Sequence, residues 1–177
     1  ELIFDGSSLV IDEGGCVIWE GKNFEEDFYV IDTEDIPAGK ESNHLKEDIS
    51  FVHKALTSGI NDYLAKTGFS RALVALSGGI DSSVVACLAV SALGAENVLG
   101  VGMPSRYSSK ESLIDAEILA KNLDIEFRVI PIEKVFSTFL ETLNSEAHPV
   151  MDIAEENLQA RIRGNIIMFI SNREGYL

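Results

Sequence analysis

The sequence predicts an α/β fold, a doubly wound parallel sheet with helices on both faces, preceded by a short N-terminal β appendage. Three observations predict it. From residue 71 onward, short apolar runs alternate with segments whose apolar residues recur at helical spacing. A glycine-rich turn follows the first of these runs and opens a helix, as at the carboxyl edge of a parallel sheet. Residues 1–35 instead carry strand and hairpin signals.

The elements of the α/β region follow one another regularly. A helix begins at Ile49 and continues to Gly68, a residue type that commonly follows the last helical turn. We then expect strand 71–76, helix 82–93, strand 97–102, helix 109–123, strand 125–130, helix 134–144 and a last helix from about Ile153 to Arg173. Apolar strands that alternate with helices indicate a parallel sheet covered on both faces.

The N-terminal region has the signals of a small antiparallel arrangement. Ser8–Asp12 and Cys16–Glu20 flank Glu13–Gly15, a glycine-containing loop that predicts a hairpin, and Phe28–Asp32 is a third predicted strand. Three strands in so few residues bury too little to form a core alone. The next residues are polar. We therefore expect an appendage at 1–35, a linker at 36–47 and an α/β domain at 48–177.

Composition and charge exclude several classes of protein. The chain has 177 residues, 46% of them hydrophobic, and a net charge of −15 that is concentrated in its first 50 residues. So acidic a chain is a poor candidate for non-specific binding to nucleic acid or to an anionic membrane. No apolar run is long enough to span a membrane, and two cysteines make no disulfide framework. We expect a cytoplasmic protein in which Cys87 is a small core residue.

The stretch Ser77–Ser83, Ser-Gly-Gly-Ile-Asp-Ser-Ser, has the chemistry of a phosphate site. Backbone N–H groups at a turn and in the first helical turn lack partners, and the helix dipole favours an anion there. Gly78 and Gly79 allow a positive φ and a close approach of the backbone to the anion. The serines add hydroxyl donors, and Asp81 suits a Mg²⁺ ion held against phosphate oxygens. The alternative is an ordinary Gly-Gly turn with a Ser or Asp N-cap.

A second polar segment, Met103–Ser109, follows the next strand of the predicted sheet. Backbone groups near Met103 suit the edge of an adenine, and Arg106 suits a phosphate or a carboxylate. The alternative is a plain polar loop, but its position at the same sheet edge as the glycine turn favours a site.

The last predicted helix carries two polar faces. Asn157, Arg161 and Gly164 share one face by i, i+4 and i+7 spacing, whereas Gln159 and Arg163 share another. A polar face with arginine suits an anionic ligand or a subunit interface. The alternative is a solvated face, which is the usual state of charged helix surfaces.

Three segments together closely resemble the NAD⁺ synthetase family, a branch of the PP-loop ATP pyrophosphatases: Ala75–Ser83, Met103–Ser109 and Glu155–Gly164. The first is shared by all PP-loop enzymes, which cleave ATP between the α and β phosphates. The other two distinguish NAD⁺ synthetases from GMP synthetase, asparagine synthetase and tRNA-modifying relatives. Residues 1–35 look like the tail of a nitrilase-type glutaminase domain, which points to the glutamine-dependent form.

The resemblance implies an adenine nucleotide alpha-hydrolase-like fold and a ligase of NAD biosynthesis. The implied reaction is the ATP-dependent amidation of deamido-NAD⁺ to NAD⁺ through a deamido-NAD adenylate, with release of AMP and pyrophosphate. Ammonia comes from glutamine or is free. ATP and Mg²⁺ are the implied cofactors, nucleic acid and membranes are not partners, and the parent enzyme is expected to be a homo-oligomer, a dimer of synthetase domains.

The resemblance also implies roles for single residues. Asp81, Ser77 and Ser82 would be catalytic, and Asp81 would be the Mg²⁺ ligand. The residues implied to bind ATP are Ala75, Leu76, Ser77, Gly78, Gly79, Ile80, Asp81, Ser82, Ser83, Met103 and Arg106. Those implied to bind deamido-NAD are Asn157, Arg161 and Arg163. Which arginine faces the ligand stays open, because the two point to different sides of the helix.

The Glu–Lys–Cys set of the family's glutaminase has no counterpart here, and the family's synthetase domain normally continues beyond the last predicted helix. We therefore expect a fragment that cannot complete the reaction by itself. Two alternatives are open. One is another PP-loop amidotransferase, such as a GMP synthetase-like enzyme, and the other is a nucleotide-binding fragment without turnover.

Overall fold

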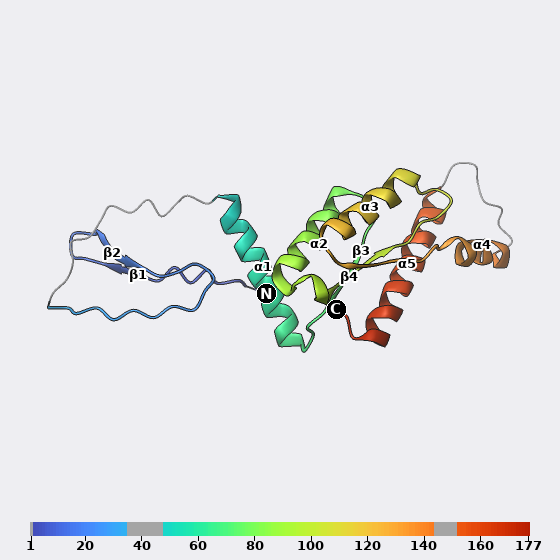
Figure 1. Cartoon of the computed structure of the whole chain (residues 1–177). Coiled ribbons are helices and arrows are strands. Elements are labelled where there is room, and N and C mark those ends of the chain that lie inside the picture. Colours follow the sequence, from blue (N-terminus) through green and yellow to red (C-terminus); the bar gives the residue numbers. More distant parts are fainter. Residues whose placement is uncertain (1, 35–47, 144–151) are drawn as a thin grey trace. The chain divides into compact units, whose positions relative to one another are not determined.

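The computed structural model describes residues 2–34, 48–143 and 152–177 (Figure 1). The chain divides into two compact units, Glu1–Gly59 and Ile60–Leu177, and the division falls within α1 (Ile49–Thr67). The predicted linker 36–47 lies outside the described residues. The assignment of the appendage, linker and domain stays a prediction.

The first unit contains the predicted hairpin. β1 (Leu9–Ile11) pairs antiparallel with β2 (Val17–Glu20), and the Asp12 N–H donates to the Cys16 carbonyl oxygen at 2.9 Å across the loop. Gly15 has a φ of +83°, a conformation that glycine adopts without steric cost. The glycine-containing loop was thus sufficient to predict the turn.

The prediction of a third strand at Phe28–Asp32 is wrong. None of these residues has a strand assignment, and Phe28 is 86% exposed. Tyr29 stacks on Trp19 with ring centroids 4.8 Å apart. Apolar alternation stabilises a strand only where one face can be buried, and most of the apolar surface of this segment stays exposed.

The helix α1 ends as predicted. Gly68 has a φ of +80°, and the Phe69 N–H donates to the Leu64 carbonyl oxygen at 2.9 Å. This bond satisfies a carbonyl of the last turn and is typical of a helix that stops at a left-handed glycine.

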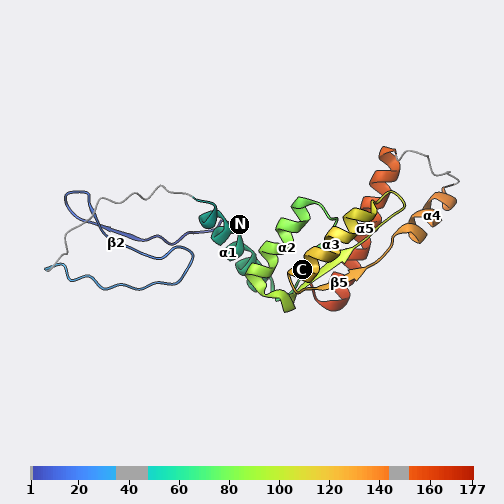
Figure 2. The same cartoon turned by 45° about the horizontal axis from the view of Figure 1, so that its top comes forward.

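A parallel sheet forms the centre of the second unit (Figures 1 and 2). Its strands lie in the order β3 (Ala72–Ala75), β4 (Val98–Gly102) and β5 (Glu126–Val129). The helices are α2 (Ile80–Leu93), α3 (Lys110–Asn122), α4 (Glu133–Thr142) and α5 (Ile153–Glu174), with a short 3₁₀ turn at Ala95–Asn97. Each predicted strand and helix of this region is present, with described ends that differ from the predicted ones by at most two residues, and the predicted helix end at 144 lies outside the described residues.

The two faces of the sheet pack against different helices, which confirms the predicted α/β fold. On one face, Leu99 and Val101 of β4 lie in a cluster with buried residues of α4 and α5. On the other, Val98 lies with Ala86 of α2 and Ala116 of α3. Alternation along the central strand therefore supplies both cores, as expected for a strand that is buried on both sides.

The last residues of the chain return to the sheet. The Leu177 N–H donates to the Arg71 carbonyl oxygen and the Leu73 N–H donates to the Leu177 carbonyl oxygen, both at 2.9 Å. The buried ring of Tyr176 lies 4.0 Å below the Arg71 guanidinium. The end of α5 is thus held beside β3.

The prediction that Cys87 belongs to the core is wrong, because its side chain is exposed. α2 is apolar on all sides, and the residues that it buries are the small Ala86 and Ala89. In a helix each residue is rotated by about 100° from the one before it. Cys87 therefore points away from the side that packs on the sheet. Within the described residues, no helix is long and apolar enough to cross a membrane.

Candidate functional site

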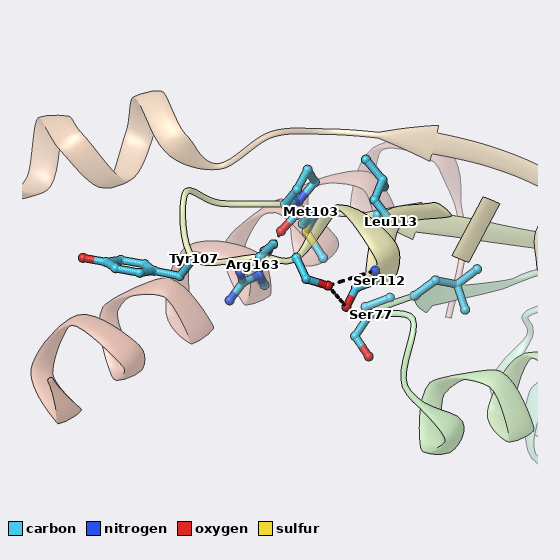
Figure 3. A pocket seen from close by; sticks show the side chains of 12 residues that line it. Ser77, Met103, Tyr107, Ser112, Leu113 and Arg163 are labelled. Atoms are coloured by element: carbon cyan, nitrogen blue, oxygen red, sulfur yellow. Dashed lines mark hydrogen bonds between the residues drawn. The ribbon is translucent and has the colours of Figure 1, made fainter. Parts of the chain in front are cut away.

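A pocket of about 390 Å³ lies at the carboxyl ends of β3 and β4 (Figure 3). Its walls come from the ends of both strands, from the start of α3 and from α5. The lining residues are Ala75, Leu76, Ser77, Gly102, Met103, Pro104, Tyr107, Ser108, Ser109, Ser112, Leu113 and Arg163. The pocket lies at the sheet edge where parallel sheets bind their ligands.

The loop after β3 is fixed by a contact between two backbones. Gly78 has a φ of +80°, and a Cβ placed on it would lie 2.2 Å from the Ser112 carbonyl oxygen. Only glycine fits, because any side chain would meet both an unfavourable φ and a backbone atom. The glycine loop therefore rests directly on the first turn of α3.

Hydroxyl groups order the same loop from within. The Gly79 N–H donates to Ser77 Oγ at 3.3 Å, and the Ser77 N–H donates to Ser82 Oγ at 3.3 Å. The hydroxyls of Ser82 and Ser83 donate to the Gly79 carbonyl oxygen at 3.0 and 2.9 Å. The predicted loop residues are thus joined in one network at the beginning of α2.

The N-terminus of α2 has no side-chain cap. Its N-cap residue is Gly79, in extended conformation, and makes no side-chain hydrogen bond to the first turn. A helix begins with N–H groups that have no partner within the helix, and the helix dipole adds positive potential there. An oxyanion at this point would accept hydrogen bonds from these N–H groups and would also be stabilised by the helix dipole.

Asp81 lies in the first turn of α2 and is exposed. Among the described residues, no group of three or more His, Cys, Asp or Glu side chains could hold a metal ion. A metal cage made by protein side chains alone is therefore not formed in this part of the chain. One carboxylate beside a phosphate site does suit Mg²⁺, which commonly binds one or two carboxylates, phosphate oxygens and water.

The two polar faces of α5 have different surroundings. Gln159 is 2% exposed and Arg163 is half-buried, whereas Asn157 and Arg161 are exposed. Arg163 Nε donates to the Met103 carbonyl oxygen at 3.1 Å, and Arg163 Nη2 donates to Gln159 Oε1 at 3.4 Å. Burial lowers the pKa of the Arg163 guanidinium. The two faces that the sequence distinguished therefore have different surroundings: Arg163 lines the pocket, whereas Asn157 and Arg161, which the family resemblance grouped with it, are exposed.

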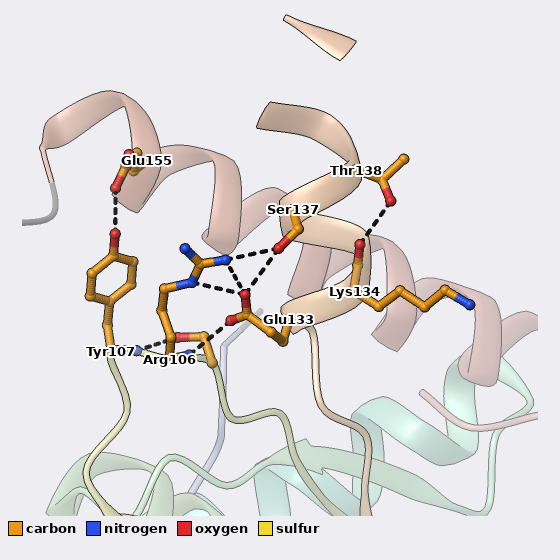
Figure 4. A network of polar contacts seen from close by, with 8 residues as sticks. Arg106, Tyr107, Glu133, Lys134, Ser137, Thr138 and Glu155 are labelled. Carbon is orange, nitrogen blue, oxygen red and sulfur yellow. Dashed lines mark hydrogen bonds and ion pairs between the residues drawn. The ribbon is translucent and has the colours of Figure 1, made fainter. Parts of the chain in front are cut away.

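The segment after β4 is anchored to two helices (Figure 4). Arg106 is paired with Glu133 of α4, through Nε at 2.8 Å and through the Arg106 backbone N–H at 3.0 Å. The Tyr107 hydroxyl donates to Glu155 of α5 at 2.9 Å. The first pair lowers the pKa of Glu133, and the second contact raises the pKa of Tyr107. The anchoring residues Glu133 and Glu155 were not predicted as partners of this segment.

The predicted ATP residues fall into three groups in the structure. Ala75, Leu76, Ser77 and Met103 line the pocket, while Gly78 to Ser83 form the adjoining loop and the first turn of α2. Arg106 is not among the lining residues, because it points to Glu133 and Ser137 (Figure 4). Its place in an ATP site stays a prediction.

Comparison with known proteins gives concordant matches. The family model for NAD synthase matches residues 52–177. The chain is 44% identical to the glutamine-dependent NAD(+) synthetase of Thermotoga maritima and 40% identical to that of Aquifex aeolicus, in each case over 100% of this chain and 37% of the relative.

Solved structures agree with these matches. The glutamine-dependent NAD⁺ synthetase of Acinetobacter baumannii, solved with ADP, has a TM-score of 0.87 at 35% identity and covers 98% of this chain and 34% of its own. An NH3-dependent NAD synthetase of Campylobacter jejuni has a TM-score of 0.66 at 28% identity, over 73% of this chain and 55% of its own. The chain spans about a third of the length of its glutamine-dependent relatives. With the glycine loop, the pocket and these matches in agreement, the chain belongs to the NAD synthase family.

Proposed function

We propose that the protein carrying this chain is a ligase that converts deamido-NAD⁺ to NAD⁺ with ATP, and that this chain supplies most of the ATP-binding part. The observation that carries the proposal is the uncapped N-terminus of α2 in a glycine loop at the edge of the pocket. The match to a family member solved with ADP supports the choice of nucleotide.

In this proposal the pyrophosphate of ATP lies on the loop Ser77–Ser83 and the adenosine lies in the pocket beside Met103. The backbone N–H groups at the start of α2 and the serine hydroxyls neutralise charge that builds on the leaving pyrophosphate. The loop is already ordered by its own hydrogen bonds, so little reorganisation is needed when ATP binds.

Asp81 is the residue that would hold Mg²⁺. When bound, the ion would reduce the negative charge on the phosphate oxygens, which otherwise repels an attacking carboxylate. Asp81 lies in the first turn of α2 and is exposed, so its carboxylate is accessible to an ion bound there.

The proposed chemistry needs no covalent nucleophile from this chain. A carboxylate oxygen of the nicotinate group attacks the α-phosphorus, the bond to the bridging oxygen breaks, and pyrophosphate leaves. Ammonia then attacks the carbonyl carbon of the adenylate, its nitrogen gives up one proton to solvent, AMP leaves, and the amide is formed. The pocket residues bind and orient the reactants, which accelerates both steps without proton transfer by a side chain of this chain.

Asn157 and Arg161 are proposed to bind deamido-NAD on the exposed face of α5. Because that face is open in a single chain, a second copy in a homo-oligomer is a suitable partner for completing the site. Residues 1–35 are proposed to be the tail of a glutaminase domain that supplies ammonia, and the protein is proposed to act in the cytoplasm.

The decisive experiment measures pyrophosphate release by a protein of the full relatives' length. Release should require ATP, Mg²⁺ and deamido-NAD together. Release with xanthosine monophosphate in place of deamido-NAD would instead favour a GMP synthetase-like enzyme. Tight ATP binding with no pyrophosphate release for either acceptor would favour a nucleotide-binding protein without turnover.

Calorimetric titration of the 177-residue chain with MgATP tests how much of the site it contains. Binding would indicate that the loop and the pocket suffice for nucleotide recognition. A folded chain that does not bind MgATP would mean that recognition belongs to the longer protein.

The role of Asp81 is tested with Asp81→Asn in the longer protein. We expect a loss of adenylation of at least a hundredfold, with an unchanged melting temperature and a higher Mg²⁺ concentration for half-maximal ATP binding. Asp115→Asn, an exposed substitution on α3, is the matched control. Near-normal turnover of Asp81→Asn, with the Mg²⁺ dependence of the wild type, would refute the assignment.

A further inference from the structure

Arg163 brings a positive charge into the wall of the pocket, and no carboxylate in the described part of the chain is paired with it. Its two hydrogen bonds go to the Met103 carbonyl oxygen and to the neutral amide of Gln159. Within the described residues it has no ion pair, although it is half-buried. A guanidinium in such a place has lost water and has gained no counter-charge.

Other arginines that are held in place in the second unit are compensated differently. Arg106 is paired with Glu133, and Arg128 is paired with both Glu126 and Glu174. The Arg71 guanidinium lies over the ring of Tyr176. Arg163 is held by two hydrogen bonds to neutral groups, and the described residues provide it with neither a carboxylate partner nor an aromatic ring.

The groups that face Arg163 leave room for an anion. Tyr107 also lines the pocket, and its hydroxyl donates a hydrogen bond to Glu155. The lining residues Ser77 and Ser108 carry no charge. Burial lowers the pKa of the Arg163 guanidinium, and no carboxylate of the described residues forms an ion pair with it. A guanidinium has five N–H donors, of which the two contacts use two, so the rest are available to an oxyanion.

We propose that Arg163 binds an oxyanion in the pocket, namely the α-phosphate of the bound nucleotide. The inference rests on the proposed function, because it takes the pocket to hold an adenine nucleotide. If the terminal phosphates lie on the α2 loop and the base lies by Met103, the α-phosphate lies between them. Arg163 contacts the backbone of Met103 and shares the pocket with Ser77, so it stands at that point.

The same inference removes Arg163 from the group assigned to deamido-NAD. Arg161 and Arg163 then serve different substrates from different faces of one helix. The other source of an oxyanion is the carboxylate of the acceptor, which must also approach the α-phosphorus. Both sources share the chemistry of a charge-assisted, two-pronged hydrogen bond.

The test compares adenosine with AMP, which differ only in the α-phosphate. Each is titrated calorimetrically into the intact protein, as wild type and as Arg163→Met. We expect AMP affinity to fall at least tenfold and adenosine affinity to change by less than threefold. Arg173→Met, an exposed substitution on the same helix, should leave both affinities unchanged.

Other outcomes are distinguishable. Equal weakening of AMP and adenosine would mean that Arg163 only positions Met103, which overturns the inference. Unchanged AMP affinity with lost deamido-NAD affinity would assign the oxyanion site to the acceptor carboxylate instead. A wild-type protein that binds neither nucleotide would refute the proposed function itself. If Arg163→Met does not fold, Arg163→Lys replaces it, and AMP affinity should then fall by a smaller factor because the charge remains while the two-pronged geometry is lost.

Discussion

The N-termini of α2 and α3 open at the same edge of the sheet, yet their first turns are completed in different ways. At α3, Ser109 Oγ accepts a hydrogen bond from the Ser112 N–H at 3.1 Å, so the helix caps itself. At α2, Gly79 stands in the N-cap position and offers no side chain to the first turn. The first turn of α3 thus has an N–H group bonded to a side chain of its own helix start. The first turn of α2 has no such side-chain cap, so its N–H groups are accessible to a ligand.

The difference between the two helix starts indicates which backbone N–H groups can contribute binding free energy to a ligand. An N-cap Asn, Asp or Ser stabilises a helix by only a few tenths of a kcal/mol more than glycine does, so Gly79 leaves the first turn of α2 without a side-chain acceptor at a small cost in stability. The amides that are left without a protein partner are then free to meet an oxyanion. The neighbouring capped helix gives the loop a rigid surface to rest on, through the contact of Gly78 with Ser112.

The largest expected effect on stability and on MgATP binding comes from Gly78→Ala, which would push the glycine loop away from the first turn of α3. The added Cβ would lie 2.2 Å from the Ser112 carbonyl oxygen, at a φ of +80°. The backbone strain alone costs about 1–3 kcal/mol, and relief of the clash must move the loop. We expect a lower urea midpoint and no detectable MgATP binding by calorimetry.

Gly164→Ala is the matched control for that experiment, because its Cβ would meet no atom within 4 Å in the middle of α5. It should raise stability by roughly 0.5–1 kcal/mol, the usual gain for alanine over glycine in a helix. MgATP affinity in Gly78→Ala equal to that of the wild type would show that the loop does not need its contact with α3.

The next effect comes from giving α2 the cap that it lacks. Gly79 has a φ of −87° and a ψ of 159°, which suit an N-cap side chain, so Gly79→Asn should fit. We expect stability to rise by a few tenths of a kcal/mol and ATP affinity to fall roughly twofold to threefold, because the phosphate must displace the new cap. Thermal melts and calorimetry measure the two quantities.

Gly79→Ala adds a Cβ but no hydrogen-bond acceptor, and serves as the control for the cap. It should weaken ATP binding less than Gly79→Asn does. Equal weakening by both substitutions would trace the effect to lost space at the loop and would count against an open helix start as the source of affinity.

A smaller effect is expected from Ser109→Ala, which removes the cap of α3. Stability should fall by about 1 kcal/mol, with ATP affinity within about twofold of the wild type. Urea unfolding and calorimetry provide the measurement. A large loss of affinity at unchanged stability would mean that both helix starts serve the ligand, and the contrast between them would fail.

The smallest effect is expected from Glu133→Gln, which removes the negative charge from the pair that Arg106 forms with α4. The Arg106 guanidinium lowers the pKa of Glu133 below its usual 4.5, so the ionised pair contributes above that pH and loses its contribution as pH falls through the lowered value. Because the pair is about two-fifths exposed, the effect should be smaller than that of Ser109→Ala.

Urea unfolding midpoints of the wild type and of Glu133→Gln, at pH 7 and at pH 3.5, measure the contribution of the ion pair to stability. The variant should be slightly less stable than the wild type at pH 7, and the difference should shrink at pH 3.5. Glu141→Gln, an exposed change on the same helix, should show no such pH dependence. A difference that grows at low pH would have the wrong sign for this ion pair.

The sequence was sufficient for features that depend on local pattern. The glycine loop, the hairpin turn and the alternation of apolar strands with helices were all predicted, because each depends on residues that are neighbours in the chain. The third strand failed because a strand also needs a partner surface, which Phe28–Asp32 lacks among the described residues.

The orientation of the side chains on α5 shows what the sequence could not predict about the candidate site. The i, i+4 pattern grouped Gln159 with Arg163, but which face of the helix meets the sheet edge depends on packing. The pairing of Arg106 with Glu133 joins residues 27 positions apart on different elements, and no local signal predicts it. Tertiary contacts of this kind decide which arginine meets a ligand.

The hydrogen bonds of Leu177 also bear on the order in which this unit folds. Arg71 and Tyr176, which lie beside that contact, are 105 residues apart in the chain. Loop closure over such a separation is slow, so β3 should pair first with β4 and gain its second neighbour only late. During synthesis the edge of β3 that Leu177 later covers would stay unpaired until α5 has emerged, which exposes this edge to wrong association while the chain is incomplete.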